Sequence, residues 1–421
     1  MRIVDLIEKK KQGLEHTQEE ISFIVDNYTK NKIDDYQVSA WLMAVCFQGL
    51  SDIETAYLTK SFIDSGETLD FSSISPHIAD KHSTGGVGDK VTLVLIPILA
   101  ALDIYSAKLS GRGLGFTGGT IDKLESIPGF KVELTNDEFI EQIKKVKAAI
   151  SSQSPNLTPA DAKFYALRDV TATVDNKSLI CASVVSKKIA SGATSIVLDV
   201  KYGSGAFLKT KKEAQELGDL MVKTAKLLDK NIDFAISSME TPLGKCIGNS
   251  LEVIEAIEFL KGNYEKDLYD TTKELAVKTI INCKKAPDSL AASELFDKVI
   301  ENGEALKKLK EIIDAQKGDS RVIEDYSLFP IGKNKAAIKS TKKGIIKNID
   351  ALKIAKSAKL LGAGRDKKSD KINFGAGIKL NYKNNDSIEK DSIIMELFYD
   401  EIPEQKLLEA IETAKNAVEY K

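Results

Sequence analysis

Two glycine-rich segments constrain the fold and function of this 421-residue chain more than any other feature. The first reads Lys81-His82-Ser83-Thr84-Gly85-Gly86-Val87-Gly88-Asp89, and the second runs from Lys108 to Thr120 as KLSGRGLGFTGGT. Both fall at strand-to-helix junctions of an alternating pattern, where α/β sheets usually bind ligands. Backbone amides in such turns approach an anion closely, while Lys81 adds a cation and Ser83 a hydroxyl donor. The sequence therefore predicts an anion-binding site.

The rest of the pattern predicts an α/β fold with three domains. A discontinuous helical domain is expected over 1–67 and 161–192, with capping boxes at Thr17–Glu20 and Ser51–Glu54. A large α/β domain with a mainly parallel central sheet is expected over 78–155 and 193–330, followed by an α+β domain over 331–421. Strands are expected at 104–109, 195–200, 232–237, 344–349 and 376–382, and helices at 91–102, 212–228, 251–260 and from about 403.

Composition excludes several classes of function. The 60 Lys and Arg residues nearly balance the 62 Asp and Glu residues, so no global field favours nucleic acid or a membrane surface. The most apolar run, 91–102, is too short to span a bilayer. The four cysteines form no CxxC pair, and only three histidines occur, so a cytoplasmic protein without a His-based metal cluster is expected. We interpret His16 and His77 as ordinary surface residues.

The glycine motifs also argue against organic cofactors. Neither is a P-loop, because no GK[ST] follows the glycines. Gly113-x-Gly115-x-x-Gly118 matches the dinucleotide fingerprint, but the acid it needs would be Glu133 or Asp137, which precede a helix. No organic cofactor is therefore expected.

The second segment carries a family resemblance. SGRGLGFTGGTIDKLESIP, at 110–128, is similar to the signature of the thymidine and pyrimidine-nucleoside phosphorylase family, and KHSTGGVGD resembles its phosphate loop. The likeness covers most of 1–262, whereas the C-terminal third matches loosely, best at 360–365. Further matching segments are 157–161, 165–174, 186–190, 198–207 and 248–253.

The resemblance implies reversible phosphorolysis of uridine, thymidine and deoxyuridine to free base and ribose or deoxyribose 1-phosphate. Inorganic phosphate is the co-substrate, displacement is direct and inverting, and the enzyme is a homodimer through its helical domain. An enzyme restricted to deoxyribosides, an anthranilate-type phosphoribosyltransferase and a non-catalytic phosphate or nucleoside-binding protein are the alternatives.

The resemblance also assigns roles to residues. The residues expected to bind phosphate are Lys81, Ser83, Thr92, Lys108, Ser110 and Thr120. The residues expected to bind the base are His82, Arg168, Ser183 and Lys187. Of these, His82, Arg168 and Lys187 are the expected catalytic residues. Relatives restricted to deoxyribosides typically have methionine at the position of Lys108, whereas relatives that accept uridine have lysine, so the broader activity is expected. Because the two sets fall in different domains, catalysis is expected to need domain closure.

Three further interpretations remain at this stage. The uridine-accepting branch binds potassium at positions matching Gly88, Lys90, Leu243, Cys246 and Glu255, but Lys90 replaces a small hydroxyl residue. The alternative is that its ammonium takes the ion's place and pairs with Glu255. Cys181 is expected to be a buried structural thiol, and Arg112 either holds the second segment's shape or touches a ligand.

Overall fold

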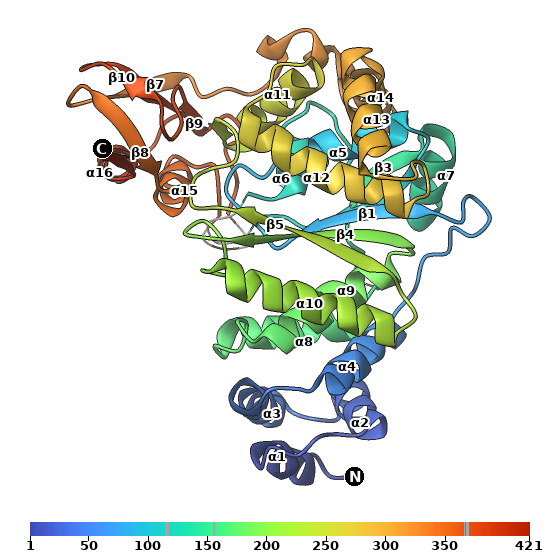
Figure 1. The fold of residues 1–421 in the computed structure, drawn as a ribbon. Coiled ribbons are helices and arrows are strands. Elements are labelled where there is room, and N and C mark those ends of the chain that lie inside the picture. The colour runs from blue at the N-terminus through green and yellow to red at the C-terminus, as the bar shows by residue number, and fades with distance from the viewer. Residues whose placement is uncertain (114–117, 155, 366, 368–369) are drawn as a thin grey trace. The chain divides into compact units, whose positions relative to one another are not determined.

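The structure is a computed structural model that describes every residue except 114–117, 155, 366, 368 and 369. The chain forms two compact units, which are described separately. The first contains Met1–His82, Gln153–Leu198 and Gln215–Phe234, and the second contains Ser83–Ser152, Asp199–Ala214 and Ala235–Lys421. Figure 1 traces the elements along the chain.

The first unit is built on helices from two distant parts of the sequence. Trp41 is fully buried and packs edge-on to Phe164, which also meets Tyr28. Each large apolar side chain buried in this way contributes about 2 kcal/mol. The expected discontinuous helical domain is thus present. Its helices are α1 (Ile3–Lys11), α2 (Gln18–Thr29), α3 (Asp35–Gln48), α4 (Asp52–Asp64), α8 (Pro159–Val170) and α9 (Lys177–Ala190).

Both expected capping boxes are confirmed. Thr17 accepts the Glu20 N–H at the start of α2, and Ser51 accepts the Glu54 N–H at the start of α4. In each box the glutamate side chain accepts the N–H of the capping residue, which satisfies two backbone donors that a helix leaves free.

The central sheet has the strand order β3-β2-β1-β4-β5, and β2 pairs with β3 in parallel. The expected strands at 104–109, 195–200 and 232–237 are present, whereas β3 was not anticipated. It is short and follows a helix whose charged pattern dominates the sequence there. The strands are β1 (Ile78–Ser83), β2 (Tyr105–Ser110), β3 (Ala148–Ser152), β4 (Ser195–Tyr202) and β5 (Ile232–Ser238).

Helix α5 (Val91–Ala101) is the most deeply buried helix that we describe in the second unit. It is apolar on all sides because it packs against α11, α12, α13 and α14, as Figure 1 shows. Within the described residues, no helix combines the length and apolar character that a membrane span needs. Helix α10 (Lys211–Leu227) lies mostly in the first unit. Further helices of the second unit are α6 (Thr120–Glu125), α7 (Asn136–Val146), α11 (Asn249–Leu260), α12 (Lys266–Asn282), α13 (Ser289–Glu301), α14 (Glu304–Ala315), η1 (Ser320–Ile323) and η2 (Tyr326–Leu328).

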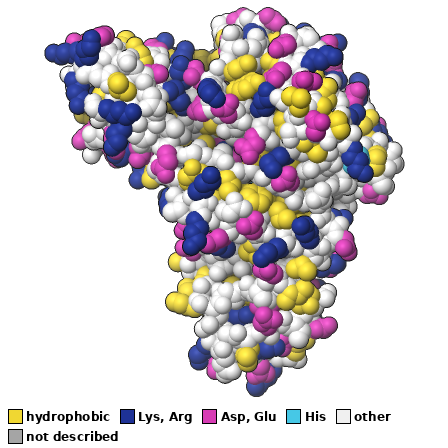
Figure 2. Space-filling view, in the orientation of Figure 1, with side chains coloured by type: hydrophobic (Ala, Val, Ile, Leu, Met, Phe, Trp, Pro, Cys, Tyr) yellow, Lys and Arg dark blue, Asp and Glu magenta, His cyan; other side chains and the backbone are white. Residues whose placement is uncertain are grey.

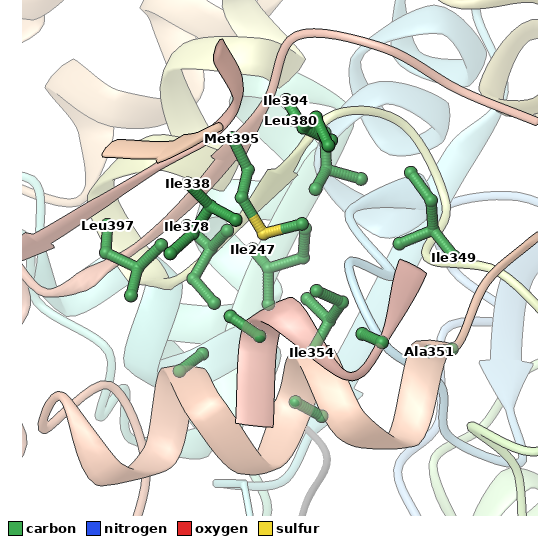
Figure 3. Close-up of a cluster of buried hydrophobic side chains, with 14 of the residues drawn as sticks. Ile247, Ile338, Ile349, Ala351, Ile354, Ile378, Leu380, Ile394, Met395 and Leu397 are labelled. Atoms are coloured by element: carbon green, nitrogen blue, oxygen red, sulfur yellow. The ribbon is translucent and has the colours of Figure 1, made fainter. Parts of the chain in front are cut away.

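The C-terminal part of the second unit packs two small antiparallel sheets against helices. Figure 3 shows its core, where Ile354 of α15 faces Ile378 and Met395. The four-stranded sheet, β6-β9-β11-β7, includes the short β6 from the middle of the chain. The elements are β6 (Cys246–Ile247), β7 (Asn334–Lys339), β8 (Gly344–Ile349), α15 (Ala351–Leu360), β9 (Gly377–Leu380), β10 (Ser387–Ile388), β11 (Ile393–Tyr399), α16 (Glu404–Lys415) and β12 (Val418–Tyr420).

Candidate active site

Sheet topology locates the site. From β1 the chain moves outward to β2 and β3, and then β4 joins the opposite side of β1. The order therefore reverses between β1 and β4, which is a topological switch point, where open α/β sheets bind ligands at the carboxyl ends of their strands. The first glycine loop, residues 84–90, follows β1, and the second glycine loop, residues 111–119, follows the neighbouring β2.

The first glycine loop continues alongside the chain of β4. The Thr84 N–H donates to the Asp199 carbonyl at 3.0 Å, and the Thr84 hydroxyl accepts the Lys201 N–H at 2.9 Å. The Ser83 hydroxyl accepts the Gly85 N–H at 3.1 Å, so its own proton can be donated elsewhere. The backbone φ of Gly85 is +97°, a conformation that residues other than glycine rarely adopt.

A buried lysine, Lys201, packs against this loop. The ammonium of Lys201, whose side chain is fully buried, lies 2.9 Å from Asp199, 3.0 Å from the Ser237 hydroxyl and 3.8 Å from Asp89. Burial alone would lower the pKa of Lys201, but attraction to Asp199 and Asp89 outweighs burial and raises it. A Cβ at Gly86 would lie 2.6 Å from the Met239 sulfur and 2.7 Å from the Lys201 side chain, so one of these side chains would have to move.

A second buried lysine joins the end of the first glycine loop to α11. Lys123 is 1% exposed, and its ammonium donates to the Asp89 carbonyl at 2.7 Å and lies 2.8 Å from Glu252. The other oxygen of Glu252 accepts the Gly248 N–H at 3.2 Å. The end of the first glycine loop is therefore fixed by the buried ion pair between Lys123 and Glu252.

A third buried lysine, Lys90, lies among the residues expected to bind potassium. Its ammonium donates to the carbonyls of Leu243 (2.7 Å) and Cys246 (3.0 Å) and to the Glu255 carboxylate (2.7 Å). Burial alone would lower the pKa of Lys90, but the charge of Glu255 outweighs burial and raises it. The ion pair that was the alternative to a potassium site is thus present.

The second glycine loop is anchored by a buried carboxylate. Asp122 of α6 is 1% exposed and accepts the Gly113 N–H at 2.6 Å. Arg365, from the C-terminal part of the unit, donates two hydrogen bonds to it, at 2.8 and 3.0 Å. Arg112 approaches Asp122 at 3.4 Å and also pairs with Glu125, so its contacts favour the interpretation that it holds the loop's shape. Residues 114–117 of the motif lie outside the described residues.

The expected phosphate ligands fall on β1, β2 and the helices that follow them. Lys81 and Lys108 lie within the strands and are 1% and 2% exposed, while Thr92 lies in the first turn of α5. The hydroxyl residues Ser83, Ser110 and Thr120 are half-buried where the strands end and α6 begins. His82 is also half-buried in β1. Their roles stay a prediction.

The expected base-binding residues lie on α8 and α9 in the first unit. Arg168 is only 2% exposed and donates to the carbonyls of Thr173 (3.1 Å), Leu179 (3.1 Å) and Val174 (2.7 Å). Burial lowers its pKa, although Asp161 opposes this effect. The guanidinium therefore braces the turn between the two helices.

Lys187 and Ser183 are in direct contact. The Lys187 ammonium donates to the Ser183 hydroxyl at 2.8 Å and forms an ion pair with the buried carboxylate of Asp161. The ring of Tyr165 has its centroid 5.9 Å from this ammonium and 5.8 Å from the guanidinium carbon of Arg168. Two cations, a hydroxyl and an aromatic ring thus lie where α8 and α9 meet.

Two single-residue expectations have different outcomes. The expectation that His16 is a surface residue is wrong, because His16 is 3% exposed and its Nε2 accepts the Trp41 indole N–H at 3.1 Å. Position in a helix-connecting segment gave no sign of this burial. Cys181 is fully buried as expected, and burial raises the pKa of its thiol to about 12, which argues against a nucleophile.

Comparison with known proteins gives the family. Family models match over residues 4–66 (glycosyl transferase family, helical bundle domain), 75–306 (glycosyl transferase family, a/b domain) and 345–421 (pyrimidine nucleoside phosphorylase C-terminal domain). The chain is 49% identical to a pyrimidine-nucleoside phosphorylase of Bacillus subtilis, over 94% of this chain and 92% of the relative. It is 45% identical to a pyrimidine-nucleoside phosphorylase of Geobacillus stearothermophilus, over 100% and 98%. The chain belongs to the pyrimidine-nucleoside phosphorylase family.

The fold is shared more widely than this phosphorylase family. Anthranilate phosphoribosyltransferase from Thermus thermophilus superposes with a TM-score of 0.60 at 16% identity, over 74% of this chain and 99% of that one. Structural similarity at this sequence identity shows a shared fold only. The curated phosphorylases, by contrast, match over nearly the whole length.

Sequence reasoning missed several residues that contact the expected ligand-binding residues or the glycine loops within each unit. Asp161 and Tyr165 share a face of α8 with Arg168, since the three are spaced at i, i+4 and i+7, and this spacing was a usable signal. Asp122 was visible only as an acid inside the signature. Lys123 and Lys201 gave no signal, because single lysines are normally exposed.

Proposed function

We propose that this protein catalyses the reversible phosphorolysis of uridine, thymidine and deoxyuridine. The proposal is supported by curated relatives, named pyrimidine-nucleoside phosphorylases, at 45% and 49% identity over nearly the whole chain. The structural observation that carries it is the pair of glycine loops after the neighbouring strands β1 and β2, beside the switch point. Loops in this arrangement offer backbone and hydroxyl donors to a tetrahedral dianion from more than one side.

In the proposed reaction, phosphate attacks the anomeric carbon of the sugar. The glycosidic C–N bond breaks, a C–O bond to phosphate forms on the opposite face, and the electron pair of the broken bond leaves with the base. Lys81 and Lys108 would supply positive charge, and Ser83, Thr92, Ser110 and Thr120 hydroxyl donors. No covalent enzyme intermediate is needed, and no organic cofactor takes part.

The leaving pyrimidine gains negative charge on its oxygens. Arg168 and Lys187 are cations fixed before the reaction, the first by three carbonyls and the second by Asp161 and Ser183. Donors that need no reorganisation stabilise developing charge, and losing one typically costs on the order of 10²–10³ in rate. His82 would donate a proton to a base oxygen as the bond lengthens.

Lys108 supports the broader substrate range. It lies in β2 at 2% exposure, two residues before Ser110, where an ammonium can serve both phosphate and a ribose hydroxyl. We infer that uridine is accepted as well as the deoxyribosides, and that the enzyme is not a thymidine phosphorylase restricted to deoxyribosides.

We also propose a homodimer that forms through the helical domain and works in the cytoplasm. Three apolar side chains on one face of α3 support this: Tyr36, Met43 and Phe47 are 70%, 37% and 82% exposed. Exposed apolar faces of this kind are typical of interfaces. On the face drawn in Figure 2, basic and acidic side chains are interspersed, which fits small-molecule substrates better than nucleic acid.

One assay tests the proposal. The enzyme is incubated with uridine, thymidine or deoxyuridine, with and without phosphate, and base release is followed by ultraviolet absorbance. Release from all three nucleosides only when phosphate is present is expected. Release without phosphate would indicate a hydrolase, and no release would favour a non-catalytic binding protein; either result contradicts the proposal.

A variant pair on α9 tests the base-binding residues. Lys187→Met is expected to lower kcat/KM for uridine by about 10²–10³. Lys177→Met is the matched control, because Lys177 lies on the same helix but is half-buried and pairs with Glu216 instead of Asp161. Equal losses in the two variants would show that Lys187 has no special role.

A further inference from the structure

The ammonium of Lys90 has the surroundings of a bound cation. Its side chain is fully buried, and its three N–H groups meet the Leu243 carbonyl, the Cys246 carbonyl and the Glu255 carboxylate. An ammonium has three donors and no acceptor, so this oxygen set satisfies it completely. We propose that Lys90 is a built-in monovalent cation that makes this enzyme independent of potassium.

The carboxylate of Glu255 requires a positive charge at this place. Its side chain is only 10% exposed, and its oxygens also accept the N–H groups of Lys245 (2.6 Å) and Cys246 (2.9 Å). A buried carboxylate without a cation is strongly destabilising. Either Lys90 or a bound ion must therefore supply the charge, and Lys90 does so at 2.7 Å.

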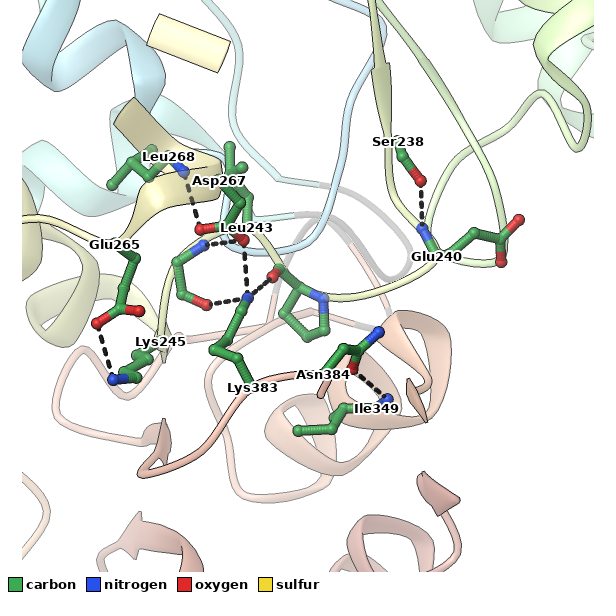
Figure 4. Close-up of polar contacts among 12 residues, drawn as sticks. Ser238, Glu240, Leu243, Lys245, Glu265, Asp267, Leu268, Ile349, Lys383 and Asn384 are labelled. Atoms are coloured by element: carbon green, nitrogen blue, oxygen red, sulfur yellow. Dashed lines mark hydrogen bonds and ion pairs between the residues drawn. The ribbon is translucent and has the colours of Figure 1, made fainter. Parts of the chain in front are cut away.

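The carbonyls that face Lys90 belong to a segment whose neighbouring carbonyls are bound by a second lysine, Lys383. Figure 4 shows Lys383 donating to the carbonyls of Pro242 (2.5 Å) and Gly244 (2.8 Å) while pairing with Asp267 at 2.8 Å. The segment between β5 and α11 is thus fixed by an ammonium on each side. With its carbonyls fixed, the space at Glu255 is a preformed cation position, and Lys90 fills it.

The first glycine loop packs against this ion pair. The Lys90 N–H donates to the Gly88 carbonyl at 2.9 Å, and the next residue begins α5. Gly88 has a φ of +71°, and a Cβ there would lie 2.6 Å from the Leu243 carbonyl and 3.3 Å from the Lys90 ammonium. The loop therefore packs directly on the cation position. Lys90 is accordingly a positioning residue, because it acts on phosphate through the loop.

The inference also explains why potassium does not fit here. An ion at this position would need the oxygens that the ammonium already uses, and two positive charges would share one buried carboxylate. Lys90 also replaces the small hydroxyl side chain that, by the family resemblance, would leave room for an ion.

In the test, Lys90→Ser makes room beside Glu255, and thermal unfolding measures whether an ion binds there. Wild type, Lys90→Ser and Lys90→Met are compared by thermal unfolding in choline, potassium and lithium chloride at equal ionic strength. Wild type is expected to show the same Tm in all three salts. Lys90→Ser should lose about 3–6 °C in choline and recover most of it in potassium but not in lithium. Lys90→Met should lose a similar amount in every salt, because its side chain fills the space without a charge.

Lys383→Ser is the matched control. Lys383 also binds two carbonyls and a carboxylate, but its side chain is 15% exposed and that of Asp267 is 33% exposed, so water can replace it. Its Tm should not respond to potassium specifically. An equal potassium response in Lys383→Ser and Lys90→Ser would overturn the inference, as would a wild-type Tm that rises in potassium.

Crystals soaked in rubidium give a second readout that does not depend on the stability of a variant. Wild-type crystals should show no anomalous peak within coordination distance of Glu255, whereas Lys90→Ser crystals should show one. A peak in wild type would refute the inference. Neither this readout nor Tm depends on turnover, so the inference can fail while the proposed phosphorolysis stands.

Discussion

Replacing Arg365 with methionine is expected to destabilise the protein and to weaken phosphate binding. Arg365 reaches from the C-terminal part of the second unit to Asp122, which in turn holds the Gly113 N–H at the start of the second glycine loop. The methionine side chain keeps most of the apolar volume but removes the charge. Asp122 would then remain buried with weaker partners.

The magnitude follows from the geometry. Asp122 and Arg365 have side chains that are 1% and 10% exposed, and two N–O distances of 2.8 and 3.0 Å join them. Removing one partner of a buried pair typically costs about 3–5 kcal/mol. Because Gly113 and Arg112 still contact Asp122, the lower end, about 3 kcal/mol, is expected. For a chain of this length such a loss corresponds to a Tm lower by about 3 °C.

The assay combines thermal unfolding with initial rates measured at increasing phosphate concentration. Arg112→Met is the matched control, because Arg112 approaches the same carboxylate at 3.4 Å but is 42% exposed. Exposed pairs contribute about 0–1 kcal/mol, so this variant should lose about 1 °C or less. In Arg365→Met the KM for phosphate should rise about tenfold, while the KM for uridine changes little.

A double-mutant cycle with Asp122→Asn completes the test. The loss in the double variant should fall short of the sum of the two single losses by at least about 1 kcal/mol, since both variants break one interaction. Additive losses, or equal effects of Arg112→Met and Arg365→Met, would refute the reasoning.

Four further predictions concern single side chains. Lys108→Met should lower kcat/KM for uridine at least about tenfold more than for thymidine, and equal losses would contradict its role in ribose selection. Asp161→Asn removes the counter-charge of Lys187 and should lower kcat for uridine about tenfold or more while KM changes little; Asp161→Glu should recover part of the loss, which a purely structural role does not predict. Burial lowers the pKa of His16 below its unfolded value, so the unfolded chain binds more protons and Tm should fall as pH decreases from about 6.5 to 5; a smaller slope in His16→Gln is the expected check. Phe47→Glu should convert the dimer to a monomer in sedimentation velocity, and an unchanged sedimentation coefficient would place the interface elsewhere.

The sequence predicted those parts of the fold that local chemistry determines. Capping boxes need only residues three apart, so the starts of α2 and α4 were predicted correctly. The short apolar stretches that overlap β2, β4 and β5 were also recognisable, because buried parallel strands are rich in apolar residues. The short β3 and the strand β6 lack such runs, and only pairing with distant segments defines them.

The interior of the candidate site was harder to predict for the same reason. The partners Lys90 and Glu255 are 165 residues apart, and Lys123 and Glu252 meet only because α6 packs against α11. Sequence spacing cannot indicate such pairs without an alignment. The resemblance supplied Glu255 and Lys90, but nothing in the sequence indicated that Lys201 is fully buried.

Three buried lysines around the first glycine loop act on its structure through ion pairs with carboxylates. Lys90, Lys123 and Lys201 each lie within 3 Å of a carboxylate, so their charge is already neutralised and adds little attraction for phosphate. What they provide is a fixed loop, and donors that need no reorganisation stabilise developing or bound negative charge most effectively. Replacing any of these three lysines should therefore lower both Tm and the affinity for phosphate.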